Sequence, residues 1–380
     1  MSRNIAIVGA GLIGRILALE CQMAGMSVTL FDRDNKDGKQ SCAYTGAGML
    51  APFSELEFAD PIITALGFES LSLWTDLLKK LPDVYFQKEG TLVLAHPQDF
   101  SDLHRFKRSI QYKLEGTNWQ SLNIALPENI IVNCTRDAID SLETNLPSFF
   151  TQGYYLPHEG QIDNKQIMSA LRQKLESLDV KWNTNIEVSS FTDFSAFDVT
   201  IDCRGLGAKT NLKNLRGVRG ELLLVEAPEV HLNRPIRLMH PRHPIYIVPR
   251  QNNQFIIGAT SIESQDMRPL TVQSALELLS AACTVRPAFA EGSILESRVN
   301  CRPALPNNLP SITLSGNKNS SYIISINGLY RHGFLIAPKI ARLVFHYIQT
   351  QVASPHYSLL FDQTASLKDF RTLGESSFCN

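Results

Sequence analysis

Three glycines near the start of the chain have the spacing needed to bind a phosphate group. Gly9, Gly11 and Gly14 form the pattern G-x-G-x-x-G, directly after a short apolar run at residues 5–8 that is typical of a buried strand. The first glycine permits a tight turn, the second lets the backbone approach a pyrophosphate, and the third lets a helix pack on the strand. The first N–H groups of that helix and its positive dipole end then bind the phosphates.

The residues that follow complete a β-α-β unit. A helical pattern of apolar residues covers 16–23, and a second strand at 28–31 ends at Asp32. An acid about 20 residues past the glycines can accept hydrogen bonds from the hydroxyls of a ribose. The combination predicts a dinucleotide site, and the alternative is a glycine turn in an α/β core without a ligand.

Two later stretches are rich in small residues and could approach the same ligand. Residues 41–52 read SCAYTGAGMLAP, in which Ser41 or backbone N–H groups could reach a phosphate, although a plain loop over the sheet fits equally well. Residues 200–207 read TIDCRGLG, a strand that ends in a small-residue turn and could carry the backbone past the dinucleotide. Between these stretches, residues 186–188 lie where a second crossover should return to the first sheet.

A second strand–turn–helix unit lies near the C-terminus. A strand at 322–326 leads into a glycine-punctuated turn at 327–333 and a helix at 334–349. The N-terminus of that helix could face a second polar edge of the cofactor, such as the pyrimidine end of a flavin. A nicotinamide dinucleotide has less need of such a closing element, so we expect FAD rather than NAD.

The order of the predicted elements indicates a mixed α/β fold with two interleaved domains. The β-α-β order gives way from Val218 to a strand-rich region and then returns. We expect a Rossmann-type FAD-binding domain from residues 1–83, 150–215 and 311–370, and an antiparallel-sheet substrate domain from residues 84–149 and 216–310. Helices are expected at 60–81, 100–114 and 161–178, and strands at 84–87 and 90–95 joined by a short turn.

The bulk composition excludes several classes of function. With 380 residues, 44% of them apolar, and a formal net charge of −1, the chain gives no electrostatic case for binding nucleic acid or an anionic membrane. No apolar run reaches the ~18 residues needed to span a bilayer, and the first strand begins too early for a signal peptide, so we expect a cytoplasmic protein. Seven scattered cysteines form no C-x-x-C pair, which indicates free thiols and no metal site.

Six motifs spread over nearly the whole chain match one family in the family's order. The chain resembles the FAD-dependent D-amino-acid oxidase family, and within it the glycine oxidases of thiamine (thiazole) biosynthesis. The resemblance implies an FAD domain made of separate segments and a second domain whose antiparallel sheet covers the flavin. The motifs are GAGLIG at 9–14, GAGML at 46–50, YIVPR at 246–250, GAT at 258–260, CRP at 301–303 and GLYRHGFLIAP at 328–338.

The motifs and the resemblance together give a set of expected contacts to a non-covalently held FAD. No cysteine or histidine lies in an obvious flavin-linking motif. The expected contacts are Gly9, Ala10, Gly11, Leu12, Ile13, Gly14, Asp32, Arg33, Ser41, Cys42, Ala47, Gly48, Met49, Ile186, Gly205, Gly328, Leu329, Tyr330, Arg331, His332, Gly333, Phe334 and Leu335.

The resemblance also implies a substrate site for a small amino or imino acid. Tyr246 and Arg302 would hold the substrate carboxylate, since an arginine fork pairs bidentately with it and a phenol adds a third donor. Arg331 would lie at the flavin and near the substrate. Because the flavin carries the redox chemistry, we assign no catalytic acid or base.

The expected reaction is oxidation of the C–N bond, with hydride passing from the α-carbon to flavin N5. The resulting imine would hydrolyse to an α-keto acid and ammonia, and oxygen would reoxidise the flavin to give hydrogen peroxide. Residues 304–311 read ALPNNLPS where many glycine oxidases carry D-G-x-P, and Ser261 follows the GAT motif where an apolar residue is common. These departures concern the identity of the substrate.

Two alternatives remain open at this stage. One is a flavin dehydrogenase of a bulkier amine or 2-hydroxy acid that uses a quinone or a protein as electron acceptor, and the other is a flavoprotein accessory module without turnover. Beyond a small-molecule substrate and oxygen or another acceptor, the sequence leaves open whether the chain forms a homo-oligomer. His240 and His243 are expected in a loop near the entrance.

Overall fold

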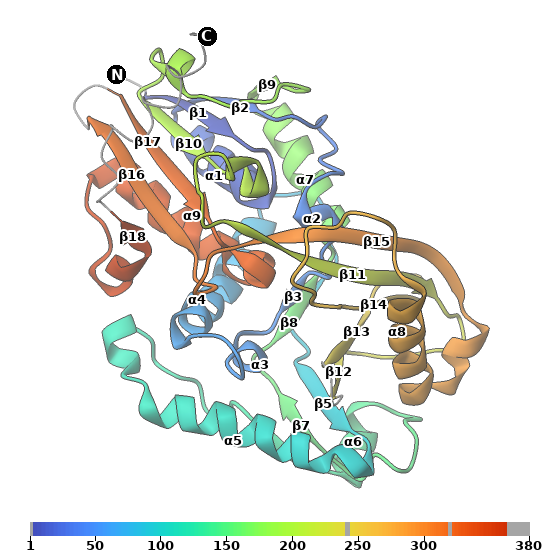
Figure 1. The fold of residues 1–380 in the computed structure, drawn as a ribbon. Coiled ribbons are helices and arrows are strands. Elements are labelled where there is room, and N and C mark those ends of the chain that lie inside the picture. Colours follow the sequence, from blue (N-terminus) through green and yellow to red (C-terminus); the bar gives the residue numbers. More distant parts are fainter. Residues whose placement is uncertain (1–2, 240–243, 318–320, 363–380) are drawn as a thin grey trace, which may run out of the picture. The chain divides into compact units, whose positions relative to one another are not determined.

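The computed structural model describes residues 3–239, 244–317 and 321–362, and the chain divides into two compact units. Each unit is assembled from segments that are far apart in the sequence, as the mixed colours of each part show (Figure 1). Unit 1 consists of Met1–Tyr44, Met168–Gly217 and Arg302–Asn380, and unit 2 consists of Thr45–Ile167 and Val218–Cys301. His240, His243 and the predicted domain segment 363–370 lie outside the described residues.

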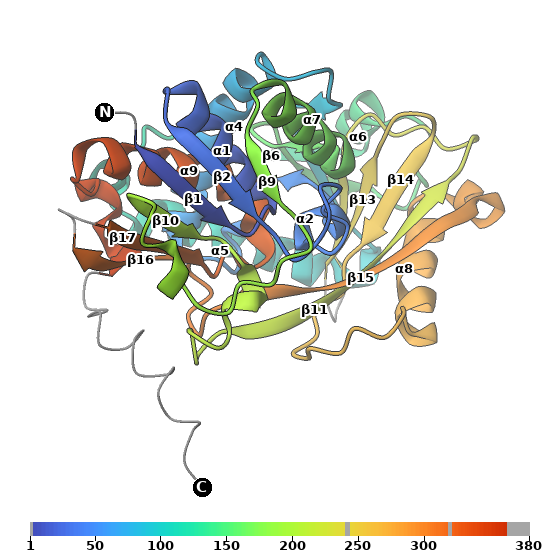
Figure 2. The ribbon, with the colours of Figure 1, turned by 90° about the horizontal axis from the view of Figure 1, so that it is seen from above.

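Unit 1 is built on a seven-stranded sheet in the order β18-β16-β17-β10-β1-β2-β9. Neighbouring strands from β17 through β9 are all parallel, while β16 runs antiparallel to β17. Figure 2 shows β17, β10, β1 and β2 side by side. The strands are β1 (Asn4–Val8), β2 (Ser27–Phe31), β9 (Lys181–Asn183), β10 (Val199–Asp202), β16 (Ser311–Asn317), β17 (Ser321–Asn327) and β18 (Phe361–Asp362).

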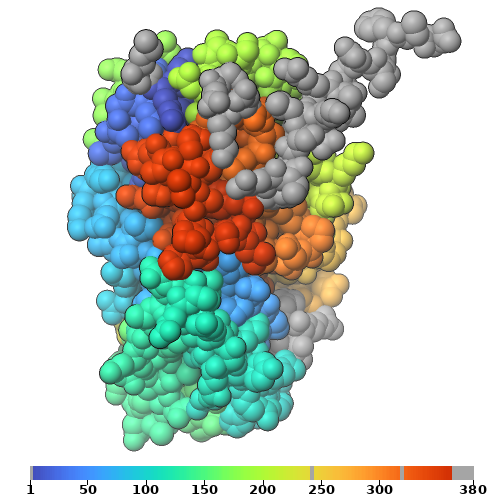
Figure 3. All heavy atoms as spheres, turned by 90° about the vertical axis from the view of Figure 1, so that its left-hand side faces the viewer, coloured from blue at the N-terminus to red at the C-terminus, as the bar shows by residue number. Residues whose placement is uncertain are grey.

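Two helices of unit 1 begin at the carboxyl edge of this sheet. Helix α1 (Leu12–Met23) follows β1, and α9 (Gly333–Thr350) follows β17. The two helices pack against each other, so that the red atoms of the C-terminal part adjoin the blue atoms of the N-terminal part (Figure 3). Ile5, Ala6 and Ile7 of β1 are fully buried, in agreement with the apolar run predicted to be a strand.

Unit 2 contains an eight-stranded sheet in the order β15-β11-β14-β13-β12-β5-β7-β6. The ends of β11 and β15, residues 216–217 and 302–304, are assigned to unit 1. The strands are β5 (Thr91–Ala95), β6 (Val132–Thr135), β7 (Gln152–Leu156), β11 (Arg216–Glu226), β12 (Ile236–Met239), β13 (Ile245–Pro249), β14 (Gln254–Gly258) and β15 (Ser293–Ala304). The helices are α3 (Pro52–Glu55), α4 (Pro61–Leu78), α5 (Phe100–Gly116), α6 (Arg136–Leu142) and α8 (Val272–Val285), while α2 (Cys42–Thr45) and α7 (Asn164–Ser177) cross the unit boundaries.

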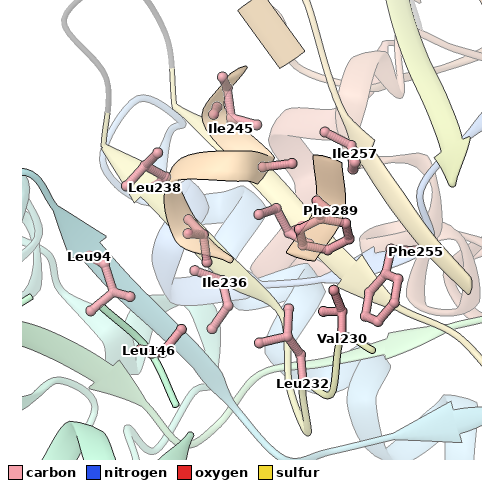
Figure 4. Close-up of a cluster of buried hydrophobic side chains, with 14 of the residues drawn as sticks. Leu94, Leu146, Val230, Leu232, Ile236, Leu238, Ile245, Phe255, Ile257 and Phe289 are labelled. Carbon is pink, nitrogen blue, oxygen red and sulfur yellow. The ribbon is translucent and has the colours of Figure 1, made fainter. Parts of the chain in front are cut away.

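The alternation of side chains along these strands gives unit 2 its main apolar core. One face of the sheet carries Ile236, Ile245 and Ile257, which pack in one cluster with residues of α8 and with Phe289 (Figure 4). Residues one position along the strands point to the opposite face, because side chains alternate in a strand. Tyr246 and its cross-strand partner Arg237 therefore lie on the face away from this core.

The structure confirms the predicted mixed α/β fold. Helices α4, α5 and α7 confirm the helices predicted at 60–81, 100–114 and 161–178. The strands expected at 84–87 and 90–95 are also present, as β4 (Phe86–Gln87) and β5, but they belong to different sheets. Strand β4 pairs with β8 (Gly160–Ile162), which also pairs with β3 (Met49–Leu50). No helix among the described residues is both long and apolar enough to cross a membrane.

The unit boundaries differ from the domain boundaries expected from the sequence. Residues 45–83 and 150–167 cluster with unit 2 and not with the Rossmann-type sheet, whereas 302–310 belong to unit 1. The pairing of β3 and β4 with β8 is one physical reason, since it joins residues 49–50 and 160–162 to the strand at 86–87. Strands of two or three residues carry too little alternation to be recognised in a sequence.

The closest packing in the first turn predicts a large difference between two glycine substitutions. A Cβ added at Gly14 would lie 2.0 Å from the carbonyl oxygen of Gly9, so Gly14→Ala forces β1 and α1 apart. We expect a loss of about 1–3 kcal/mol in the free energy of unfolding, the usual cost of overpacking a core. Gly116→Ala at the end of α5, where an added Cβ meets nothing within 4 Å, is the control. Equal thermal midpoints for the two variants would contradict this packing.

Candidate functional site

The turn after β1 requires glycine at its first position and leaves its second glycine open. Gly9 has a positive φ of +102°, and a Cβ added there would lie 2.5 Å from the carbonyl oxygen of Cys203. At Gly11 the added Cβ would meet only the Cβ of Ser41, at 4.0 Å, so the chain leaves this position open. Gly11 is the N-cap of α1 and provides no side-chain cap, and the first turn holds no acid. The orphan N–H groups and the open space therefore fit the pyrophosphate of a dinucleotide.

Asp32, at the end of β2, is fixed by the same turn. Its Oδ2 accepts a hydrogen bond from the N–H of Ala10, and its Oδ1 accepts one from the N–H of Asp34 at 2.7 Å. A carboxylate has further lone pairs, so these contacts leave room for ribose hydroxyls. The N–H of Ile186 donates to the backbone carbonyl of Asp32 at 2.9 Å, which brings two expected cofactor residues together. Arg33 is exposed.

The turns after β10 and β17 are joined by a residue that sequence reasoning missed. Asn327 donates from Nδ2 to the carbonyl oxygen of Gly205 at 2.9 Å, while its Oδ1 accepts from the N–H of Gly328 at 2.9 Å. Both glycines have positive φ angles, +56° and +75°. A polar residue directly before a glycine at the end of a predicted strand is the signal that could have identified Asn327.

The turn from β17 into α9 gathers the remaining residues expected at the cofactor. The rings of Tyr330 and His332 meet edge to face at 5.7 Å, and His332 is buried. Arg331 is exposed, with its guanidinium carbon 5.9 Å from the Tyr330 ring. Helix α9 begins at Gly333 without a side-chain cap or an acid in its first turn. Because β17 is two strands from β1, this second helix N-terminus lies on the order of 10 Å along the same edge.

In unit 2, the expected cofactor residues Ala47 and Gly48 form a loop that leads into Met49 of β3, and a buried arginine holds this loop. Gly48 has a φ of +64°, and a Cβ added there would lie 1.9 Å from the carbonyl oxygen of Ile162. The Arg250 guanidinium donates to the carbonyl oxygens of Ala47 and Ile162 and to Oε1 of Gln161. Burial lowers the pKa of Arg250 to about 10. Arg250, in the YIVPR motif, therefore fixes the loop through tertiary contacts that the sequence alone does not reveal.

Tyr246, expected to bind substrate, lies on β13 opposite Gly258 of β14 and Arg237 of β12. It packs at the edge of a small apolar cluster that also includes Met49. The guanidinium carbon of Arg237 lies 5.5 Å from the centre of the Tyr246 ring. Of the other two expected substrate residues, Arg302 is half-buried near the end of β15 and Arg331 lies in the turn before α9, both in unit 1.

A buried polar network surrounds Arg237 and was also missed from the sequence. The guanidinium of Arg237 pairs with the Glu57 carboxylate and donates to the carbonyl oxygen of Ser54 at 2.8 Å. On its other side, Ser54 donates to the Glu159 carboxylate from its N–H at 2.6 Å and from its hydroxyl at 2.9 Å. Glu159 is almost fully buried, and burial raises the pKa of this carboxyl to about 7 despite these donors.

This pKa predicts how the stability of the protein depends on pH. Because the pKa of Glu159 is raised in the folded state, its stabilising contribution is complete below the unfolded value and is lost as pH rises toward 7. The free energy of unfolding should fall by up to about 1.4 kcal/mol per pH unit between pH 5 and 7 from this group. Glu159→Gln should flatten that slope in denaturant titrations, while Glu229→Gln, at an exposed position, should not. Identical slopes for wild type and Glu159→Gln would contradict the assignment.

The described residues include no group of three or more histidine, cysteine or acidic side chains that could hold a metal ion. The features of unit 1 instead fit an elongated nucleotide. Two uncapped helix N-termini and four turns lie at the carboxyl ends of the parallel strands β17, β10, β1 and β2. Such an edge is where nucleotides bind in open parallel sheets.

Comparison with known proteins agrees with this geometry. The chain is 37% identical over 352 residues to ThiO of Rhizobium etli, an oxidoreductase assigned to thiamine biosynthesis, covering 93% of this chain and 98% of the relative. It is 26% identical over 369 residues to a glycine oxidase of Geobacillus kaustophilus, covering 90% and 91% of the two chains. The crystal structure of glycine oxidase from that organism superposes with a TM-score of 0.74 at 22% identity, over 92% of this chain and 95% of that one, which shows the fold.

The family model described as "DAO: FAD dependent oxidoreductase" matches residues 4–346, which is most of the chain. It includes the glycine turn of β1 and the turn from β17 into α9. The expectation of FAD in place of NAD is thereby confirmed, and the chain belongs to the DAO family of FAD-dependent oxidoreductases.

Proposed function

We propose that this enzyme oxidises the C–N bond of glycine or another small amino or imino acid. The observation that carries the proposal is the relationship to ThiO and glycine oxidase over at least 90% of the chain, combined with a dinucleotide cradle in unit 1. Both relatives are oxidoreductases, and the name of the second states an amino acid substrate. The products would be an imine, which hydrolyses to an α-keto acid and ammonia (or an amine, where the substrate nitrogen carries a substituent), and hydrogen peroxide when oxygen accepts the electrons.

The residues of unit 1 suit the two ends of FAD. We assign the ADP half to the turn at Gly9–Gly14 and to Asp32, Ser41 and Ile186, because these surround the open position at Gly11 and the end of β2. The flavin end is assigned to residues 328–335, whose uncapped helix N-terminus favours a polar, electron-rich edge. FAD, when bound, supplies the acceptor for the substrate hydride.

The substrate carboxylate is assigned to Tyr246 and Arg302, with Arg331 near the substrate. A carboxylate that leaves water needs strong replacement donors, and a guanidinium fork with a phenol provides them. Tyr246 lies on the sheet face away from the apolar core, with the guanidinium carbon of Arg237 5.5 Å from the centre of its ring. Such a clamp contributes to catalysis by holding the α-carbon in place, so no acid or base of the chain is needed if the amine binds neutral.

Anaerobic reduction of the bound flavin tests the proposed function. Glycine, sarcosine or D-alanine should bleach the flavin absorbance near ~450 nm, and admission of oxygen should restore it with formation of peroxide. Tyr246→Phe removes one hydrogen bond to the carboxylate and should weaken substrate binding by about 10–100-fold, while Arg302→Met removes the fork and should weaken it by at least as much, with flavin content unchanged in both. A flavin that stays oxidised with all three substrates would exclude this substrate class. Dye reduction without peroxide would indicate a dehydrogenase instead.

The cofactor assignment gives a separate prediction at Gly11. This residue has φ −71° and ψ −170°, a conformation open to any residue, and its added Cβ has no close neighbour, so Gly11→Ala should fold with an unchanged thermal midpoint. Its methyl group would occupy space assigned to the pyrophosphate, and we expect at least about a tenfold loss of FAD affinity. Fluorescence titration of the apoprotein measures this, with Gly116→Ala as control. Unchanged affinity would place the pyrophosphate elsewhere.

A further inference from the structure

Arg15, the residue after the last glycine of the first turn, is fully buried in α1. Its side chain donates to three backbone carbonyl oxygens from three separate segments. Nε donates to Ala10 in the glycine turn, Nη1 to Met168 in α7, and Nη2 to Lys36 in the loop beyond Asp32, each at 2.7 Å. One guanidinium thus joins the glycine turn, α7 and the loop that follows the expected ribose-binding acid.

Arg15 and Asp32 hold the two sides of the same residue. The N–H of Ala10 donates to the carboxylate of Asp32, and the carbonyl oxygen of Ala10 accepts from Nε of Arg15. Ala10 lies between Gly9 and Gly11, at the centre of the turn expected to face the pyrophosphate. Because glycine neighbours give a turn no stiffness of their own, these two contacts set its geometry.

The loop beyond Asp32 is shaped around the same guanidinium. A Cβ added at Gly38, where φ is +70°, would lie 2.6 Å from Nη2 of Arg15. The loop is further tied to α7 by ion pairs of Lys36 with Glu176, at 3.0 Å, and of Asp37 with Arg172. The Trp182 ring lies 5.5 Å from the guanidinium carbon of Arg15.

The charge of Arg15 is only partly compensated within the chain. In the part of the chain that the structure describes, its hydrogen-bond partners are all backbone carbonyls, and no carboxylate lies within ion-pair distance. Burial lowers the pKa of Arg15 to about 10, and Asp32, Asp34 and Asp37 offset that effect in part. A buried cation without a paired anion is costly, and a bound pyrophosphate would supply negative charge close to it.

We propose that Arg15 is a positioning residue for the ADP half of FAD, which it serves by fixing Ala10 and the loop 33–40 and by adding positive charge beneath the pyrophosphate. This inference rests on the proposed seat of the dinucleotide at the first glycine turn. It assigns Arg15 no contact with the flavin ring or the substrate. The loss caused by removing it should therefore depend on which half of the cofactor is offered.

The test compares apoprotein variants against three probes: FAD, ADP and riboflavin. Arg15→Met keeps the apolar stem and loses the fork, and Arg15→Lys keeps the charge without the three directional bonds. The control is Arg342→Met, which removes an arginine that pairs with Glu20 at the other end of α1, at 3.1 Å. Dissociation constants are measured by calorimetry at two salt concentrations, and intrinsic tryptophan fluorescence, to which Trp182 contributes together with the other two tryptophans, gives a second signal.

We expect Arg15→Met to weaken the binding of FAD and of ADP by the same factor, about 10–100-fold. The affinity for riboflavin should not change. Arg15→Lys should recover part of the ADP affinity and most of its salt dependence, because both follow the charge. If Arg15→Met does not fold, Arg15→Lys alone tests the inference. It should bind ADP more weakly than wild type and bind riboflavin as wild type does.

Two results would overturn the inference alone: ADP affinity unchanged in either folded variant, or riboflavin affinity weakened by the same factor as ADP. The second result would mean that Arg15 only stabilises the fold. Wild-type protein that binds neither FAD nor ADP would overturn the proposed cofactor seat and this inference together.

Discussion

The parallel pairing of β17, β10, β1 and β2 is the constraint on which the rest of unit 1 depends. Strands that run in the same direction present their carboxyl ends at one edge, and the turns that leave them must pass each other there. The chain accommodates this crowding with glycines, since Gly9 and Gly14 approach their neighbours too closely for any side chain. Gly11 remains open within this crowded turn, and the N-termini of α1 and α9 lie at the same edge of the sheet.

Buried arginines hold backbone segments together in both units. Arg15 donates to carbonyls of the glycine turn, α7 and the loop beyond Asp32, while Arg250 donates to the carbonyls of Ala47 and Ile162. Arg237 combines a carbonyl contact with an ion pair to Glu57. A planar guanidinium suits this role because its fixed fork reaches several acceptors at once. Loops built from small residues can therefore be held in place without bulky side chains of their own.

The parts of this structure that could be predicted from the sequence are those encoded by local pattern. Helix α1, the strand before it and Asp32 follow from spacing within thirty residues, and the C-terminal strand–turn–helix is equally local. By contrast, the contact of Arg15 with Met168 joins residues 153 positions apart, and that of Arg250 with Ala47 spans 203 positions. No local pattern marks such a side chain. The unit boundaries differ from the expected domain boundaries for a similar reason. Strands as short as β3 and β4 can be recognised only from their pairing with β8, which a local sequence pattern does not show. The roles of Tyr246, Arg302 and Arg331 rest on resemblance and remain predictions.

The order of strands in unit 1 also has a consequence for biosynthesis. Strand β10, at residues 199–202, pairs on one side with β1, but its other partner is β17, at residues 321–327. During translation the edge of β10 stays unpaired until more than a hundred further residues have been made, and all of unit 2's second segment is synthesised in that interval. Long-range parallel pairing of this kind slows folding and leaves an aggregation-prone edge exposed. We therefore expect unit 2 to fold first during synthesis. The sheet of unit 1 can be completed only after the strand that leads into α9 has left the ribosome.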